Sequence, residues 1–168
     1  MEDGKACIII LLSIFGAVWL ADVIHEENIK MQAFDEAVNL SKEKGIINMG
    51  ATGNLLVATT REIAKHPAIR VNVDLKADNT PKFFPYNLEV TPYPWADKEF
   101  DVAFAAHILE HLDNWEGALR EWIRIADYTI VVLPYPFLHG WFSPAHKQHF
   151  TFQNIEGIRG KYPVKIYV

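Results

Sequence analysis

Short apolar segments alternate with helical segments through most of the chain, and this alternation limits the fold more than any other feature. The segment 46–49 (IINM) is followed by a helical pattern at about 55–65, and 100–105 (FDVAFA) by a helical pattern at 113–124. The apolar segments carry few polar residues, as in a parallel sheet that is covered on both faces. Further strands are expected at 69–73, 128–133 and 164–168, with a short one at 87–90. The pattern predicts βαβ units, and therefore an α/β domain with a doubly wound, mostly parallel sheet.

Composition limits the domain organisation and the partners. The 168 residues are half hydrophobic, which suits one globular domain with its own core. The formal net charge is −5 and no Lys/Arg-rich run is present, so a nucleic acid is not the expected partner. The single cysteine, Cys7, excludes an internal disulfide and a cysteine-based zinc cluster.

The N-terminal run from Ala6 to Ala21 (ACIIILLSIFGAVWLA) carries no charge. As a helix it would span about 24 Å, against a hydrocarbon core of about 30 Å. We expect residues 1–24 to form a hydrophobic helix that anchors the chain in a membrane, with Trp19 near the interface. Residues 25–168 would then be the α/β domain, on the cytoplasmic side, beginning with a helix at 25–44. A cleaved signal peptide, with Lys5 as its positive start, and a buried core helix are the alternatives.

Residues at the ends of the strands are the candidate site, because ligands bind beyond the carboxyl ends of the strands in a doubly wound sheet. Gly50 and Gly53 follow the first strand and open a helix, where glycine lets a ligand approach the backbone. Asp74 ends the next strand, and a carboxylate there can accept both hydroxyls of a ribose. Taken alone, the glycines are explained equally well by the geometry of a turn, and Asp74 by a solvated acid at a strand end. Together they favour an adenosine-bearing ligand.

The segment HILEH, from His107 to His111, has two interpretations. H-x-x-E-H is the inverted zinc-protease signature, with two imidazoles one helical turn apart beside a carboxylate. That site would need a long helix and a third ligand, for which His139, His146 and His149 are candidates. A strand runs directly into His107, which argues against the long helix. The sequence therefore predicts no metal site and no stoichiometric zinc.

The same segment with its flanks resembles the class I S-adenosylmethionine-dependent methyltransferases, especially the small methyltransferase type 11 group. That group typically shows a Pro-aromatic loop, then Phe-Asp with an apolar strand, then His-x-Leu-Glu-His. Here these are Pro94-Trp95, Phe100-Asp101 and HILEH, and HKQHFT at 146–151 matches a later stretch of the group. The resemblance covers about 45–158. It implies a Rossmann-like fold and S-adenosylmethionine as cofactor, with methyl transfer to a small-molecule, lipid or sugar acceptor.

The resemblance also implies which residues bind the cofactor. The turn after the first strand would follow the methionine portion, the next strand end would hold the ribose, and the fourth strand end would flank the methyl group. The residues at the matching positions are Asn48, Gly50, Ala51, Gly53, Asp74, Glu89, Val90, Ala106 and His107, with Glu89 at the adenine amine and Val90 against the ring.

Three histidines are the candidate catalytic residues: His107, His146 and His149. His107 would flank the methyl donor. One of the other two would line the acceptor pocket as a general base, because histidine titrates near neutral pH. The alternative for both is ordinary packing in a loop over the sheet.

The first motif departs from the acid-x-Gly-x-Gly-x-Gly pattern of the family, because Asn48 stands for the acid and Thr52 for the middle glycine. Asparagine brings no charge to the ammonium of the cofactor, which removes a charge-assisted hydrogen bond of about 1.5–3 kcal/mol. The predicted strands also number one fewer than the usual seven. These departures favour a second hypothesis: a non-catalytic domain of the same fold that binds a nucleotide-like ligand or a protein partner.

Overall fold

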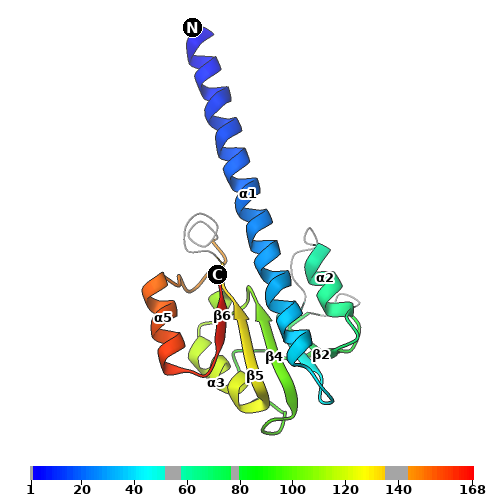
Figure 1. Cartoon of the computed structure of the whole chain (residues 1–168). Helices are drawn as coiled ribbons and strands as arrows, with labels where there is room; N and C mark the ends of the chain where they lie inside the picture. Colours follow the sequence, from blue (N-terminus) through cyan, green and yellow to red (C-terminus); the bar gives the residue numbers. More distant parts are fainter. Residues whose placement is uncertain (1, 52–57, 77–79, 135–143) are drawn as a thin grey trace.

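A six-stranded, wholly parallel sheet forms the centre of the fold (Figure 1). The structure is a computed structural model that describes residues 2–51, 58–76, 80–134 and 144–168, with side chains described from residue 16 onward, residue 58 excepted. The strands are β1 (Ile46–Met49), β2 (Ile69–Asp74), β3 (Phe83–Pro85), β4 (Phe100–Ala106), β5 (Ala126–Val132) and β6 (Lys165–Tyr167). The helices are α1 (Glu2–Leu40), α2 (Ala58–Lys65), α3 (Trp115–Ile125) and α5 (Phe152–Lys161), with a 3₁₀ turn, η1, at Leu109–His111.

The strand order is β3-β2-β1-β4-β5-β6. From β1 the chain builds outward to β2 and β3, then returns to the other side of β1 for β4 and continues to β5 and β6. The order therefore reverses between β1 and β4, which is the topological switch point of a doubly wound sheet. This confirms the predicted α/β, Rossmann-like, parallel architecture.

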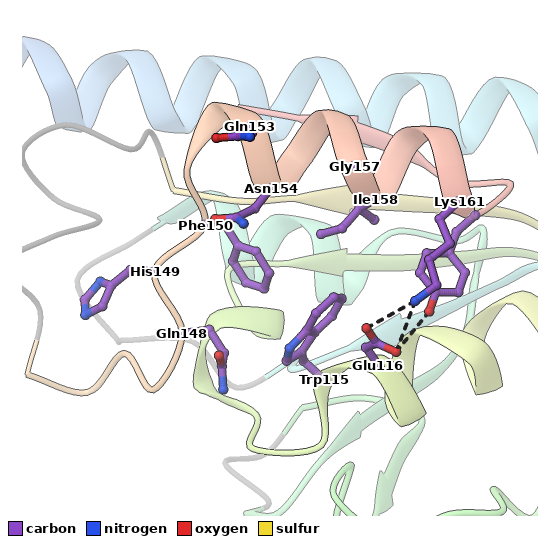
Figure 2. A pocket seen from close by; sticks show the side chains of 11 residues that line it. Trp115, Glu116, Gln148, His149, Phe150, Gln153, Asn154, Gly157, Ile158 and Lys161 are labelled. Atoms are coloured by element: carbon purple, nitrogen blue, oxygen red, sulfur yellow. Dashed lines mark hydrogen bonds and ion pairs between the residues drawn. The ribbon is translucent and has the colours of Figure 1, made fainter.

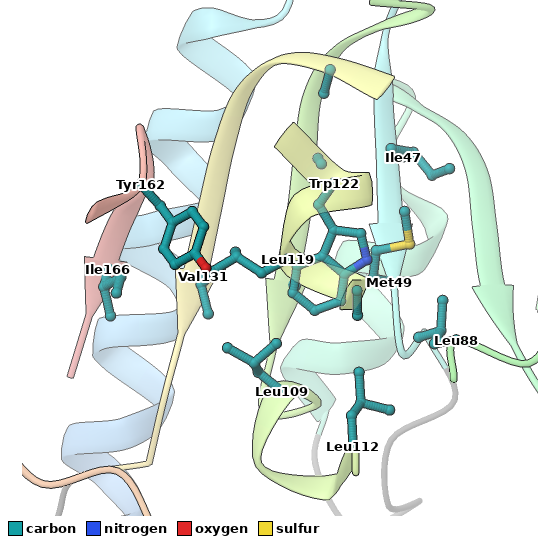
Figure 3. Close-up of a cluster of buried hydrophobic side chains, with 14 of the residues drawn as sticks. Ile47, Met49, Leu88, Leu109, Leu112, Leu119, Trp122, Val131, Tyr162 and Ile166 are labelled. Carbon is teal, nitrogen blue, oxygen red and sulfur yellow. The ribbon is translucent and has the colours of Figure 1, made fainter. Parts of the chain in front are cut away.

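The side chains alternate between two faces of the sheet, and each face has its own core. Ile47 and Met49 of β1 face α3 and α5, in a cluster that also holds Leu119 and the fully buried Trp122 (Figure 3). Ile46 of β1 faces the opposite side, together with residues of α1 and α2. That second cluster comprises Ala33, Phe34, Ala37, Ile46, Ile63, Ile69, Val102, Phe104, Ile130 and Val132. The strands are apolar on both faces because helices cover both faces.

Asp101 fixes the connection between α1 and β1. Its Oδ2 accepts hydrogen bonds from the backbone N–H groups of Lys42, Lys44 and Gly45, at 2.7, 2.9 and 2.9 Å. Asp101 is buried, and Gly45 adopts a φ of +76° that glycine tolerates without strain. The Phe-Asp pair at the start of β4 thus has a structural reason: the carboxylate satisfies three backbone donors in a tight turn.

Two details of the sheet were predicted wrongly. The third strand is Phe83–Pro85, where the sequence pattern predicted no strand, and residues 87–90, which were expected to form a short strand, form a turn. In that turn the N–H of Glu89 donates to Oδ1 of Asn87 at 3.0 Å, and the N–H of Val90 donates to the Asn87 carbonyl at 3.0 Å. Asparagine competes for backbone groups in this way and favours a turn over a strand.

α1 is one continuous helix of 39 residues, and the predicted boundary at residue 24 falls inside it. Its C-terminal half packs on the sheet, while its N-terminal half projects past the carboxyl ends of the strands (Figure 1). Val18, Trp19, Leu20 and Ile24 are exposed on the projecting half.

The predicted membrane anchor is not supported. The side chains of residues 6–15, which supply much of the apolar run, lie outside the described residues. In the part of the chain that the structure describes, no helix combines the length and apolar character that a bilayer crossing requires.

Candidate functional site at the carboxyl edge of the sheet

The register of the sheet brings three of the predicted site segments together. Met49, the last residue of β1, is paired with Val73 of β2 on one side and with Ala105 of β4 on the other. The residues that follow these three therefore lie side by side at the switch point: Gly50, Asp74 and Ala106. A ligand beyond this edge would meet all three strand ends at once.

Gly50 is required by two features of its position. Its φ is +71°, a backbone conformation that residues with a side chain rarely adopt. A Cβ at this position would lie 2.8 Å from Cβ of Ile108. The N–H groups of Gly50 and Ala51 both donate to the Val73 carbonyl, at 2.9 and 3.2 Å. The turn after β1 is thus packed tightly against the HILEH segment. Gly53, the other predicted glycine of this turn, lies outside the described residues.

Asn48 takes part in a buried polar pair within the sheet. Its Nδ2 donates to Oδ1 of Asn72 at 2.8 Å, and the two residues are register partners on β1 and β2. Asn72 in turn donates to the carbonyls of Ala64 and Pro81, at 2.8 and 2.7 Å. Asparagine instead of an acid at position 48 therefore has a structural explanation, because an ionised carboxylate cannot donate to Asn72. The predicted contact between Asn48 and the amino group of a cofactor remains a prediction.

Asp74 lies half-buried at the carboxyl end of β2, as predicted. Its Oδ1 accepts a hydrogen bond from the N–H of Leu75 at 2.6 Å, and its backbone carbonyl accepts from Tyr86 at 2.9 Å. The carboxylate is held at the rim, where hydroxyl groups of a ligand can reach it.

Glu89 connects three segments around the site. Oε1 accepts from the N–H of Asp113 and Oε2 from that of Asn114, both at 2.8 Å, and Lys147 lies 3.2 Å from Oε1. Burial raises the pKa of Glu89, but the hydrogen bonds from Asn114, Asp113 and Lys147 outweigh burial and hold the pKa below its ordinary 4.5. The structure thus gives Glu89 a role in joining the 87–90 turn to the start of α3. Val90, beside it, is 52% exposed and available to an apolar ring.

His107 follows β4 with a φ of +53°, the left-handed region that side chains other than glycine seldom adopt. Its N–H donates to the Val132 carbonyl at 3.0 Å, which continues the β4–β5 ladder one residue beyond the strand. Backbone strain in a residue with a side chain is typical of functional positions.

The zinc-protease interpretation of HILEH does not fit this geometry. Only Leu109–His111 is helical, as a single 3₁₀ turn, so no long helix carries the imidazoles of His107 and His111 together. The segment forms a short 3₁₀ turn between β4 and α3.

Glu110 is buried in the middle of the segment, with 1% of its surface exposed. Its Oε1 lies 3.8 Å from Nδ1 of His107 and 3.8 Å from Nε2 of His111. Burial is the main reason that the pKa of Glu110 is raised to about 8, and the nearby Glu26 of α1 raises it further. Glu110 was not among the site residues predicted from the sequence.

His146 and His149 lie in the loop before α5 and have different surroundings. His146 packs edge to face with His111, with ring centroids 4.9 Å apart. His149 lines a cavity of about 640 Å³ between α3 and α5, at the end away from Glu116 (Figure 2). The walls of this cavity include Trp115 and Phe150, whose rings pack edge to face with their centroids 5.4 Å apart.

Trp95, in the Pro-aromatic loop, is a packing residue. Its ring contacts those of Phe84, Tyr86, Tyr93 and Phe100, with centroids 5.3 to 6.1 Å apart. The loop is also held by Arg124, which donates to the carbonyl of Trp95 at 2.9 Å.

A comparison with protein families finds that residues 55–127 match the family described as "Methyltransferase domain". No curated protein matches the chain significantly. The matched residues include β2, β3, β4, α3 and the HILEH segment, and with them Asp74 and Ala106 of the switch-point edge, whereas β1 and Gly50 precede the match. The chain therefore carries a class I methyltransferase-like domain.

Proposed function

We propose that this methyltransferase-like domain binds S-adenosylmethionine at the carboxyl edge of its sheet and transfers the methyl group to a small-molecule acceptor. The observation that carries the proposal is the meeting of Gly50, Asp74 and Ala106 at the switch point. A doubly wound sheet binds its ligand at that point. The family match supports methyl transfer as the chemistry.

Residues of the edge suit the parts of the cofactor that they would meet. The carboxylate of Asp74 is an acceptor-only group, which matches two ribose hydroxyls. Exposed Val90 offers an apolar contact to the adenine ring.

The cavity between α3 and α5 is our candidate for the acceptor. Its volume of about 640 Å³ is typical of small-molecule sites. Its lining combines the Trp115 and Phe150 rings with polar side chains, among them Gln148 and Asn154 (Figure 2). We therefore favour an acceptor with an aromatic or other apolar body over an extended lipid or a sugar.

The work of the protein in this reaction is to align the two reactants. When bound, the cofactor supplies a methyl group on a positively charged sulfur. Where the acceptor nucleophile carries a proton, His149 at the cavity end is the candidate base. His107, directly after β4, would flank the methyl donor.

The test is titration calorimetry of the full-length protein with S-adenosylmethionine, S-adenosylhomocysteine and adenosine. We expect the first two to bind with a dissociation constant well below 1 mM, and adenosine to bind more weakly because it lacks the methionine portion. If adenosine alone binds, the domain is a nucleoside-binding module and the catalytic proposal fails. If none binds at about 1 mM, corresponding to a binding free energy weaker than about −4 kcal/mol, the cofactor proposal fails.

A further inference from the structure

The loop before α5 carries a histidine to the HILEH segment from more than thirty residues away. The backbone N–H groups of Lys147 and Gln148 both donate to the Glu110 carbonyl, at 2.8 and 2.9 Å. These two bonds fix the loop directly over Glu110. His146, the preceding residue, is thereby held against His111.

Three potential ligand atoms converge at this place, one each from Glu110, His111 and His146. All three lie within 4.8 Å of one another. Metal–ligand distances of about 2.0–2.2 Å put neighbouring ligand atoms roughly 3.3–3.6 Å apart, so an ion would draw the group together by about 1 Å. His111 and His146 are only half-buried, which leaves their rings room to make that movement.

The hydrogen bond that His111 makes through Nδ1 leaves its Nε2 available to bind a metal ion. Nδ1 of His111 lies 2.9 Å from the Ala145 carbonyl, which can only accept, so Nδ1 carries the proton. In the neutral ring Nε2 then has a lone pair, and Nε2 is the atom 3.8 Å from Glu110 Oε1. Metal-binding histidines commonly donate their other N–H to a carbonyl, which fixes ring orientation and tautomer.

The second, independent observation is the carboxylate of Glu110. It is 99% buried, and within the described residues neither of its oxygens accepts a hydrogen bond. Buried polar groups normally have hydrogen-bond partners, so a buried carboxylate without one needs an explanation, and a bound cation is one such explanation. Burial of a carboxylate that accepts no hydrogen bond is costly unless its charge is met by a cation or a proton.

We infer that Glu110, His111 and His146 form a binding site for a divalent first-row transition-metal ion, with Zn²⁺ as the probe of first choice. Two imidazoles and one carboxylate are a ligand set that zinc sites use, with water or another oxygen ligand in the remaining position. Thiolate is absent from the set, and imidazole with carboxylate also suits Mn²⁺ or Fe²⁺. The inference revises the sequence-based expectation that the HILEH histidines bind no metal. It does not depend on the proposed methyl transfer, because binding is measured without any methyl donor.

The site differs from that of an inverted zinc protease. Such an enzyme would use both histidines of HILEH as ligands with the glutamate as base. Here the glutamate itself is a ligand, the second histidine comes from the loop before α5, and His107 is outside the group.

The experiment is titration of the chelator-treated, dialysed full-length protein with ZnCl₂ and separately with MnCl₂, followed by calorimetry and by elemental analysis of the dialysed complex. We expect one ion per chain. His111→Ala and His146→Ala should each weaken binding at least a hundredfold. His149→Ala, which removes an imidazole from the same loop but from outside the group, should bind as the unmutated protein does.

Glu110→Gln tests the site without the risk that weaker binding comes from misfolding, as it could in the histidine variants. It keeps the shape of the side chain and removes the buried acid, so it should fold at least as well as the unmutated protein and bind zinc at least a hundredfold more weakly. No saturable binding of either ion would overturn the inference and leave Glu110 as an acid kept protonated by burial. Binding retained in Glu110→Gln, or lost equally in His149→Ala, would also overturn it.

Discussion

Nδ2 of Asn48 donates to Oδ1 of Asn72 over 2.8 Å, inside the sheet, where both residues are buried. Nδ2 of Asn72 donates in turn to the carbonyls of Ala64 in α2 and of Pro81 in the loop before β3. One side chain therefore satisfies polar groups from three elements that surround the candidate cofactor site.

Asn72→Ala should lower the free energy of unfolding by about 2–4 kcal/mol, because it leaves an amide donor and two carbonyls without their partner in a buried position. Denaturant unfolding followed by circular dichroism measures the change. Asn87→Ala, at an exposed turn, is the matched control and should cost less than about 1 kcal/mol. A loss below about 0.5 kcal/mol for Asn72→Ala would show that the pair is not structurally important.

Gly50→Ala should destabilise the protein by about 1–3 kcal/mol, because alanine strains the left-handed backbone and its Cβ meets Ile108 at 2.8 Å. Gly157→Ala is the control: it lies inside α5 and a Cβ there meets nothing within 4 Å. That substitution should stabilise by up to about 1 kcal/mol, since alanine is the better helix former. Equal effects of the two would contradict the described packing of Gly50.

Low pH should weaken the hydrogen bonds by which Glu89 joins the 87–90 turn to the start of α3, which we call the Glu89 junction. Its pKa in the folded protein lies below 4.5, so its contribution to stability is present above the unfolded pKa and is lost as the pH falls through the folded pKa. Glu89→Gln should lower stability near neutral pH and flatten the fall in unfolding free energy between about pH 5 and 3. Glu156→Gln, whose carboxylate side chain is 68% exposed, should keep the profile of the unmutated protein. An unchanged acid profile in Glu89→Gln would show that the junction is not formed.

Removal of residues 1–24 should change the unfolding free energy of the rest by less than about 1 kcal/mol. The α1 residues that reach the core are Ala33, Phe34 and Ala37, all beyond that cut, while Trp19 and Leu20 are exposed. Thermal and denaturant unfolding of the shortened and the full chain make the comparison. An unfolded shortened chain would mean that the projecting half of α1 is part of the core.

The sequence predicted the sheet well because four of its strands are apolar runs bounded by Gly, Pro or charged residues. β1, β2, β4 and β5 lie within one or two residues of their expected positions. β3 is short and ends in proline, so no periodicity marks it. α5 was not predicted, since Gly157 and Gly160 lower its helix propensity. Its signal was the capping box, in which Thr151 and Asn154 satisfy each other's backbone N–H.

The candidate site was only partly predictable. Strand ends can be found from the sequence, and Gly50, Asp74 and Ala106 do meet at one edge. The role of Glu89 as a junction depends on contacts with residues 24 to 58 positions away, which no local pattern encodes. The same holds for Glu110 and His146, which are brought together by backbone bonds from the 147–148 segment.

The central claim, a cofactor site at the β1–β2–β4 edge, is tested most directly by titrating S-adenosylmethionine into the unmutated protein, Asp74→Ala and Asp127→Ala. Asp127 is the matched acid near the amino end of β5, where it pairs with Lys44 at 2.7 Å, away from the proposed site. We predict that Asp74→Ala weakens binding at least tenfold, equivalent to about 1.4 kcal/mol, while Asp127→Ala binds as the unmutated protein does. Failure of the unmutated protein to bind at millimolar ligand, or equal weakening by the two substitutions, would contradict the account.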